Sequence, residues 1–457
     1  MSLTALALLL LALLTPWVLG YALLKPFLKQ RYGYHALALG GGYLLGWLLL
    51  AVVLYGYHLW QRPFAVLEIL IAAWCAILPL LWLKAKPCTI EELRLEKAPG
   101  NMAYLLSLLL LLLLLYRWGL TLLDLWFKPL LPTDAGLAVS TLAKHFYLQG
   151  TMPLHITMQT SAVEPSSLLA LIQTYAALAW GRWDESVIHL PWLGVSIAMV
   201  FTVFGGLRYL GAKLLPAMLC ACAAVSFPLS DASGNLGGST QVWIALALLV
   251  AVMLWVIALT YHEWRLLLPL VVVMLVLCLS KSAILIAAGV LLLVLLWRLA
   301  GGFLTTVLLV LLIFIGVVNG DYLSALLQSL LGAVPPGEVL LLNADTRFGD
   351  YPIVGWLWQQ TINTDNWHCL ITAGAGSLLL LLLSTQRTQA RGMTLLIVAA
   401  VAALLMLLLI NVFSTATAVA LATHANHLML MIAPLVVLIA LCVYHVLSKD
   451  DETLPLI

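Results

Sequence analysis

The chain of 457 residues is 64% hydrophobic and only 9% charged, and its formal net charge is +2. A soluble domain is about half apolar and about a quarter charged, so a soluble core could not absorb this excess, whereas a lipid bilayer can. The small net charge, without any basic patch interleaved with aromatic residues, excludes a nucleic-acid partner from the prediction. The seven cysteines show neither a metal-ligand spacing nor a disulfide framework, so no metal site is predicted from them.

The first third of the chain predicts four membrane helices. Apolar runs here approach the roughly 20 residues that cross a bilayer, and backbone groups in lipid must pair within their own segment, which favours helices. The runs are Met1–Leu24, about Ala36–Trp60, about Phe64–Leu83 and about Met102–Phe127. The connections after the first and third runs carry the basic residues Lys25, Lys29, Arg31, Lys84, Lys86, Arg94 and Lys97. By the positive-inside rule these connections are cytoplasmic, and the loop beginning at Lys128 is extracytoplasmic.

Outer loop 128–166 is the first place where polar and ionisable residues gather. Asp134 follows Pro132-Thr133, so it either caps the helix that comes next or serves as a general base towards a hydroxyl acceptor. One residue can do both. The stretch Ala135–Tyr147 has helical apolar spacing and is expected to lie flat on the membrane surface.

The same loop carries three more candidate site residues. Lys144 and His145 follow Asp134 by a few turns and are candidate substrate-binding residues. Glu164, which precedes Pro165, belongs either to an ordinary helix entry or to a pair of carboxylates with Asp134. Such a pair would suit acid/base or cation-binding work, so a divalent cation is the one cofactor left open.

The middle of the chain predicts three crossings between Ser166, outside, and Thr240, inside. The apolar stretches are Leu168–Trp180, Val187–Gly205 and Leu214–Phe227. The first is short and either crosses fully or re-enters. The later stretch Leu266–Trp297 is either one long helix or two helices broken near Lys281. Hydropathy and loop charge together give an all-α bundle of about 13 membrane helices, with no soluble domain and no internal repeat.

The last third predicts a second polar outer face. Arg387 and Arg391 mark a cytoplasmic loop, which places the polar segment 320–368 outside. The candidate binding residues of this face are Arg347, Asp365, His368, His424 and His427. Arginine and histidine suit a lipid phosphate, whereas solvated loop residues are the plain alternative. Lys281, alone in an apolar stretch, either snorkels to the interface or meets the phosphate of a lipid substrate.

No P-loop, nucleophile elbow, zinc-protease or dinucleotide motif occurs in the chain. Nucleotide sugars do not reach the outer side of the membrane, so chemistry there would need a lipid-borne substrate.

Four segments, in this order, resemble the GT-C superfamily of membrane glycosyltransferases. They are PLLPTDAGLAVSTLAKHFYLQG (Pro129–Gly150), SLLALIQTYAALAWGRWDESVIHLPW (Ser167–Trp192), Asp365-Asn-Trp-His368 and THANHLMLMIAP (Thr423–Pro434). The resemblance covers a core of residues 128–457 with outer loops 128–166 and 320–368. It leaves residues 1–127 as an N-terminal set of helices, of which the first three are extra to the family.

The resemblance implies an inverting transfer of a sugar from a polyprenyl-phosphate donor to an envelope lipid, glycan or protein acceptor. The reaction would take place on the extracytoplasmic face of the bacterial inner membrane. Asp134 would act as the general base, and the late basic residues would hold the donor phosphate; Glu164, a candidate catalytic residue as a second carboxylate, is not part of this resemblance. Membrane lipids and subunits of envelope-polysaccharide machinery are the further expected partners.

The sequence also departs from the family pattern. A Gly-Tyr-Ala-Asp-like element appears as Gly238-Ser-Thr-Gln241, without its acid, no acidic residue follows soon after Lys281, and His427 occupies an arginine position. Two alternatives therefore stay open: a polysaccharide polymerase or ligase, and a catalytically silent membrane subunit of a polysaccharide-export complex. A transporter is disfavoured because no repeat is found.

Overall fold

The computed structural model describes residues 3–60, 62–87, 100–127, 134–151, 167–226, 240–261, 263–278, 430 and 433–438. Of these residues 87% are helical, and none belongs to a strand. The chain divides into two compact units, residues 1–283 with 457 and residues 284–456. Of the second unit the structure describes only Leu430 and the helical residues 433–438. Everything below concerns the first unit.

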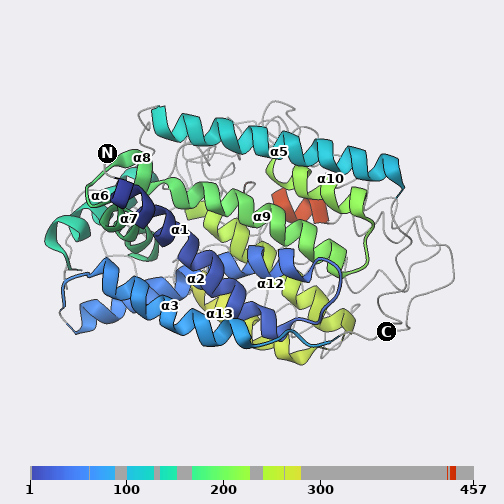
Figure 1. Ribbon diagram of the computed structural model, residues 1–457, viewed down its shortest axis with the longest axis horizontal. Helices are drawn as coiled ribbons and strands as arrows, with labels where there is room; N and C mark the ends of the chain where they lie inside the picture. The colour runs from blue at the N-terminus through green and yellow to red at the C-terminus, as the bar shows by residue number, and fades with distance from the viewer. Residues whose placement is uncertain are drawn as a thin grey trace, which may run out of the picture. The chain divides into compact units, whose positions relative to one another are not determined.

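The four helices expected in the first third of the chain are confirmed (Figure 1). They are α1 (Leu3–Leu24, followed by the 3₁₀ turn η1, Lys25–Phe27), α2 (Tyr34–Leu59), α3 (Val66–Trp82) and α5 (Asn101–Phe127). Their bounds fall within a few residues of the apolar runs, because nothing but a helix pairs the backbone of such a run internally.

The helices expected over Ala135–Tyr147, Leu168–Trp180, Val187–Gly205 and Leu214–Phe227 are also present, and further helices accompany them. They are α6 (Asp134–Gln149), α7 (Ser167–Trp180), α8 (Glu185–Ile188), α9 (Leu190–Tyr209), α10 (Leu214–Val225), α12 (Thr240–Tyr261), η2 (Trp264–Leu266) and α13 (Leu267–Cys278). Asp184 caps α8, since its Oδ1 accepts a hydrogen bond from the backbone N–H of Ser186 at 3.2 Å. The rest of the predicted stretch Leu266–Trp297 lies outside the described residues, so its division into one helix or two stays a prediction.

Five helices of the described part are long and apolar enough to cross a membrane. They span Leu3–Phe27, Tyr34–Leu59, Asn101–Phe127, Glu185–Tyr209 and Thr240–Ala258. Several shorter apolar helices accompany them. Together with the composition, these helices indicate an integral membrane protein. The total of about 13 crossings depends largely on residues outside the described ranges.

Helix α2 lies at the centre of the unit and packs mainly against α1 and α9. Both contacts use glycines. A Cβ at Gly42 would come within 2.5 Å of the backbone of Gly20 on α1, and a Cβ at Gly40 would meet the backbone of Thr202 on α9. Small residues let helix backbones approach closely, which is the usual route to association in lipid, where no hydrophobic drive exists between helices.

An aromatic cluster fills the interior between α2, α7, α9 and α12. The rings of Tyr43, Trp47, Tyr175, Trp192 and Trp243 are all buried, and neighbouring ring centroids lie 5.7–6.4 Å apart. These separations are typical of edge-to-face and offset aromatic pairs. The cluster joins α7 to the long helices.

Candidate functional site

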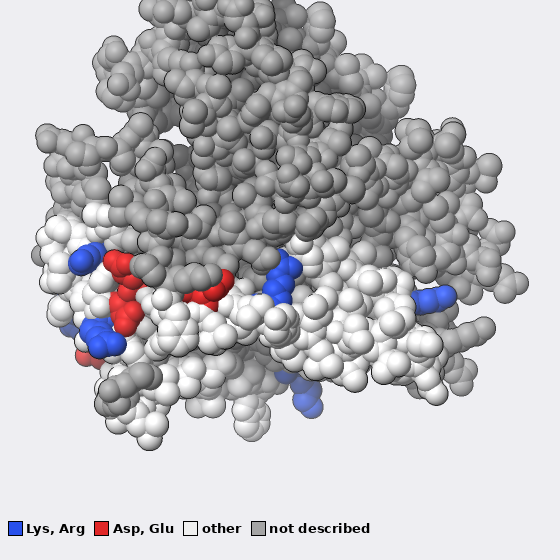
Figure 2. Space-filling model, turned by 90° about the horizontal axis from the view of Figure 1, so that it is seen from above, with Lys and Arg blue, Asp and Glu red and all other residues white. Residues whose placement is uncertain are grey.

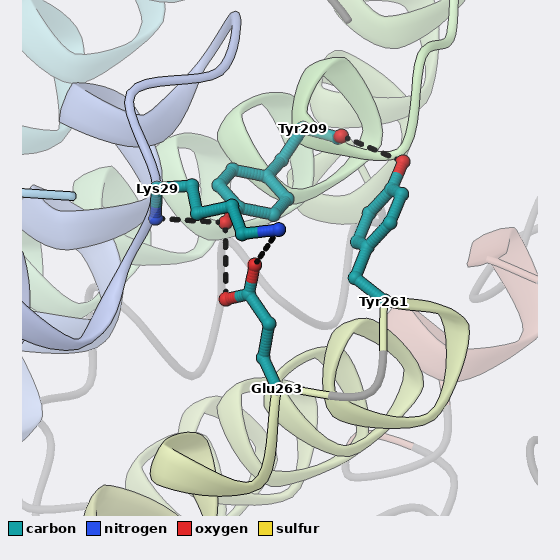
Figure 3. Close-up of polar contacts among 4 residues, drawn as sticks. All are labelled: Lys29, Tyr209, Tyr261 and Glu263. Carbon is teal, nitrogen blue, oxygen red and sulfur yellow. Dashed lines mark hydrogen bonds and ion pairs between the residues drawn. The ribbon is translucent and has the colours of Figure 1, made fainter. Parts of the chain in front are cut away.

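Polar contacts concentrate where the loop after α1 meets the ends of α9 and α12 (Figure 3). The ammonium group of Lys29 lies 3.2 Å from a carboxylate oxygen of Glu263, which precedes η2. The hydroxyl of Tyr209, the last residue of α9, accepts a hydrogen bond from the Lys29 backbone N–H at 2.9 Å and donates to Glu263 at 3.4 Å. Tyr261, the last residue of α12, donates to the Tyr209 carbonyl at 3.3 Å. One cluster thus joins three distant segments.

Arg31 adds a cation to the same cluster. Its guanidinium carbon lies 3.6 Å from the centroid of the Tyr261 ring and 6.0 Å from that of Tyr209. A guanidinium over an aromatic face is attracted by the ring quadrupole and still reaches polar partners at its edge. The loop after α1 is therefore held against α9 and α12 by both its lysine and its arginine.

We call this region the Lys29 end and define it as residues 25–33, 84–87, 208–213 and 261–267. It contains eight basic residues and one acidic residue, Glu263. The basic residues are Lys25, Lys29, Arg31, Lys84, Lys86, Arg208, Lys213 and Arg265.

The contacts at the Lys29 end contradict the side assignments made from loop charge. If all three stretches between Ser166 and Thr240 cross the membrane, the second crossing ends outside at Tyr209. The helix after Thr240 then ends outside at Glu263, whereas Lys29 was expected inside. The structure brings Lys29 into contact with both residues. That part of the predicted topology is wrong.

The error lies in α7. Its 14 residues span about 21 Å, short of the roughly 30 Å of a hydrocarbon core. Its last residue, Trp180, lies beside Trp126 at the end of α5, with ring centroids 6.4 Å apart. Ser186, in α8, donates to the Trp126 carbonyl at 3.4 Å. The chain therefore leaves α7 at the end of the bundle where α5 finishes, and α9 carries it to the Lys29 end.

The opposite end of the bundle holds α6, α7 and α8, at the left of Figure 1. We call it the α6–α8 end and define it as residues 59–66, 124–127, 134–151 and 180–189. The backbone N–H of Phe64 donates to the Gly150 carbonyl at 2.8 Å, and Tyr147 contacts Trp183 with ring centroids 5.9 Å apart. The two ends of α3 therefore belong to different ends of the bundle.

Helix α6 packs against α7 and not onto an open surface. Its residues Val139, Leu142, Ala143 and Phe146 are buried, a spacing that makes one helix face. The hydroxyl of Thr174 on α7 donates to the Ala143 carbonyl at 3.1 Å. The sequence predicted the helix correctly, but the apolar face expected to lie in the membrane surface is covered by protein.

The predicted site residues fall into two groups. Asp134 is the first residue of α6, and its role as a helix cap or a general base stays a prediction; Lys144 and His145 are exposed on that helix. The other seven, Glu164, Lys281, Arg347, Asp365, His368, His424 and His427, lie outside the described residues. Lys144 and His145 come ten and eleven residues after Asp134, which is about 15 Å along a helix. Their backbones are therefore well separated from that of Asp134, and their part in substrate binding stays a prediction.

Sequence reasoning missed Glu263, Tyr209 and Gln173. Glu263 is the only acidic residue between Asp231 and Asp321. An isolated carboxylate beside a membrane helix needs a cationic partner, and this signal could have identified Glu263 from the sequence. Gln173 on α7 is fully buried, and neither atom of its amide makes a hydrogen bond in the described part of the chain. A buried amide without hydrogen-bond partners costs free energy.

The described residues hold no group of three or more histidine, cysteine, aspartate or glutamate side chains that could bind a metal ion. The divalent cation left open by the sequence would need Glu164, which lies outside those ranges.

No family model, curated protein or solved structure matches the chain. The function is therefore argued from the chain's own residues and their arrangement.

Proposed function

We propose that this protein is an inverting glycosyltransferase that uses a polyprenyl-phosphate-linked sugar on the extracytoplasmic face of a bacterial inner membrane. The acceptor would be an envelope lipid, glycan or protein. The observation that supports the proposal most is the position of α6, which starts at Asp134 and lies at the end of the bundle opposite the Lys29 end.

The charge of the two ends supports the orientation. In the described segments that define the Lys29 end, eight of nine acidic or basic residues are basic, whereas those of the α6–α8 end include three basic and four acidic residues. Cytoplasmic loops of membrane proteins carry an excess of lysine and arginine. A cytoplasmic Lys29 end puts α6 on the outer side, where a sugar donor has to be lipid-borne.

The chemistry asked of Asp134 is the removal of one proton. The acceptor hydroxyl attacks the anomeric carbon while the carboxylate of Asp134 takes the hydroxyl proton. The bond between the anomeric carbon and the phosphate oxygen breaks, and the polyprenyl phosphate leaves with the electron pair. A single displacement of this kind inverts the anomeric centre.

The phosphate of the donor requires cations other than Lys144 and His145, because those two residues are about 15 Å along α6 from Asp134. The late basic residues Arg347, His424 and His427 are the candidates. Lys144 and His145, exposed on α6, are assigned to the acceptor or to neighbouring lipid headgroups.

The test is a transferase assay in vesicles with polyprenyl phosphate carrying radiolabelled glucose, mannose or arabinose. We expect Asp134→Asn to lower kcat by about 10²- to 10⁴-fold, the usual contribution of a general base. Glu185→Gln is the matched control, since Glu185 is an exposed acid at the same end and should keep full activity.

Two outcomes would overturn the proposal. Full activity of Asp134→Asn, with activity lost in Arg347→Ala, would indicate a polymerase or ligase. Absence of turnover with every donor in the wild-type protein would indicate the catalytically silent subunit.

A further inference from the structure

Two basic loops are fastened to each other at the Lys29 end by their main chains. The backbone N–H of Gln30 donates to the Lys86 carbonyl at 2.8 Å, and that of Lys86 donates to the Leu28 carbonyl at 3.1 Å. The side-chain amide of Gln30 donates to the Ala85 carbonyl at 3.3 Å. The loop after α1 and the chain leaving α3 therefore keep a fixed register.

This pairing collects like charges. Lys25, Lys29, Lys84 and Lys86 all lie within the two fastened segments. Within the described residues of the Lys29 end, Glu263 is the only acidic side chain, and it lies beside Lys29. Lys84 and Lys86 are exposed, and the amine of Lys25 donates to the Leu81 carbonyl at 3.3 Å, near the end of α3. Cations held together in this way attract an anion.

The same place carries exposed apolar side chains of the kind that occur at a membrane interface. Trp82, the last residue of α3, is 85% exposed, and Leu78, one turn earlier, is 59% exposed. Tryptophan is enriched where apolar helices meet lipid headgroups. Lys84 follows Trp82 by two residues, so a bilayer surface at the level of Trp82 would meet the Lys84 amine at headgroup depth and Leu78 beside the acyl chains.

We propose that Lys25, Lys84 and Lys86 form a binding site for the headgroup of an anionic phospholipid. The lysine amines donate to the phosphodiester oxygens, and the exposed side chains of Leu78 and Trp82 contact the lipid chain. The adjoining apolar surface selects a lipid over a free phosphate ion. The site is at the opposite end of the bundle from Asp134, so it does not depend on the proposed transferase activity.

The test is native mass spectrometry of the detergent-purified full chain, titrated with phosphatidylglycerol and, separately, phosphatidylcholine. We expect the wild-type protein to bind phosphatidylglycerol more tightly. Each lysine near an anionic headgroup contributes about fivefold in affinity, so Lys84→Gln/Lys86→Gln should weaken phosphatidylglycerol binding about 30-fold. Binding of phosphatidylcholine should not change.

The matched control is Arg62→Gln/Arg182→Gln, which removes two exposed cations from the α6–α8 end. It should bind phosphatidylglycerol as the wild-type protein does. Equal affinity of the wild-type protein for both lipids would overturn the proposal, and so would equal losses in the two double variants. If Lys84→Gln/Lys86→Gln does not fold, a salt titration of the wild-type protein tests the proposal instead. Raising the ionic strength from about 0.05 to 0.5 M must release phosphatidylglycerol but not phosphatidylcholine.

Competition with excess inorganic phosphate distinguishes a site for a lipid headgroup from a site for the free phosphate ion. Phosphate at millimolar concentration should leave phosphatidylglycerol bound, because it makes no contact with Leu78 or Trp82. Complete displacement would contradict a lipid site.

Discussion

The two ends of the helix bundle are built differently. At the Lys29 end the described segments of the connections are basic and are tied to each other by backbone hydrogen bonds, an ion pair and a stacked arginine. At the α6–α8 end, short helices replace the tied loops and charges of both signs mix. On the face drawn in Figure 2 the described acidic side chains lie toward the left, where α6–α8 are found, and the rightmost charged side chain is basic. Loop charges can be compared between the two ends of the bundle only after the fold has brought the separate loops together.

The largest expected effect concerns the sides of the membrane. In a cysteine-free background, Glu185→Cys should react in intact cells with a membrane-impermeant maleimide, whereas Lys213→Cys should react only after the cells are opened. The reason is that Lys213 follows α9 at the Lys29 end and Glu185 precedes it at the other end. The reverse labelling would restore the topology based on three crossings before Thr240.

A smaller effect is expected when ion pairs at the two ends are compared. The Lys29 and Glu263 side chains are 26% and 11% exposed, whereas those of Arg182 and Asp184, also 3.2 Å apart, are 69% and 25% exposed. A double-mutant cycle of Lys29→Met and Glu263→Gln should give a coupling free energy of about 1–2 kcal/mol, between the values of exposed and buried pairs. Thermal unfolding in detergent measures it.

The corresponding cycle of Arg182→Met and Asp184→Asn should give less than about 0.5 kcal/mol, since water screens an exposed pair. Asparagine keeps an Oδ1 acceptor for the α8 cap, and the cycle subtracts any remaining change in the cap. Equal couplings at both ends would mean that the Lys29 cluster does not tie the loops as described.

The smallest effect concerns Tyr261. Tyr261→Leu removes the ring under Arg31 and should lower the free energy of unfolding by about 1 kcal/mol beyond the loss of packing. Tyr261→Phe keeps the ring and removes the hydroxyl that donates the 3.3 Å hydrogen bond to the Tyr209 carbonyl, so its cost should stay below about 0.5 kcal/mol. If the phenylalanine variant were as unstable as the leucine variant, the hydroxyl and not the stacked cation would hold the loop.

The sequence predicted the positions of the helices well, but it predicted which of them cross the membrane, and in which direction, less well. The expected run Ala36–Trp60 became α2, Tyr34–Leu59, because a long apolar run has one way to pair its backbone in lipid. Hydropathy could not decide whether Leu168–Trp180 crosses. That depends on contacts such as Trp126 with Trp180, which are set by packing between distant segments.

The candidate site was predictable only in part. A helix starting at Asp134 follows from local residue types, and the structure contains it. The Lys29 cluster does not follow from local patterns, because Lys29, Tyr209 and Glu263 are far apart in the sequence. The packing of α6 against α7 could not be predicted either, because the same apolar spacing is found on a helix face covered by protein and on one covered by lipid.

The main-chain pairing of residues 28–30 with Lys86 also bears on the order of synthesis. Both paired segments lie within the first 87 residues, as do α1, α2 and α3. Contacts between segments close in sequence form faster than contacts that must wait for a distant partner. The first three helices can therefore be inserted and fastened before α9 and α12 leave the ribosome, and those later helices then dock onto a platform that already exists.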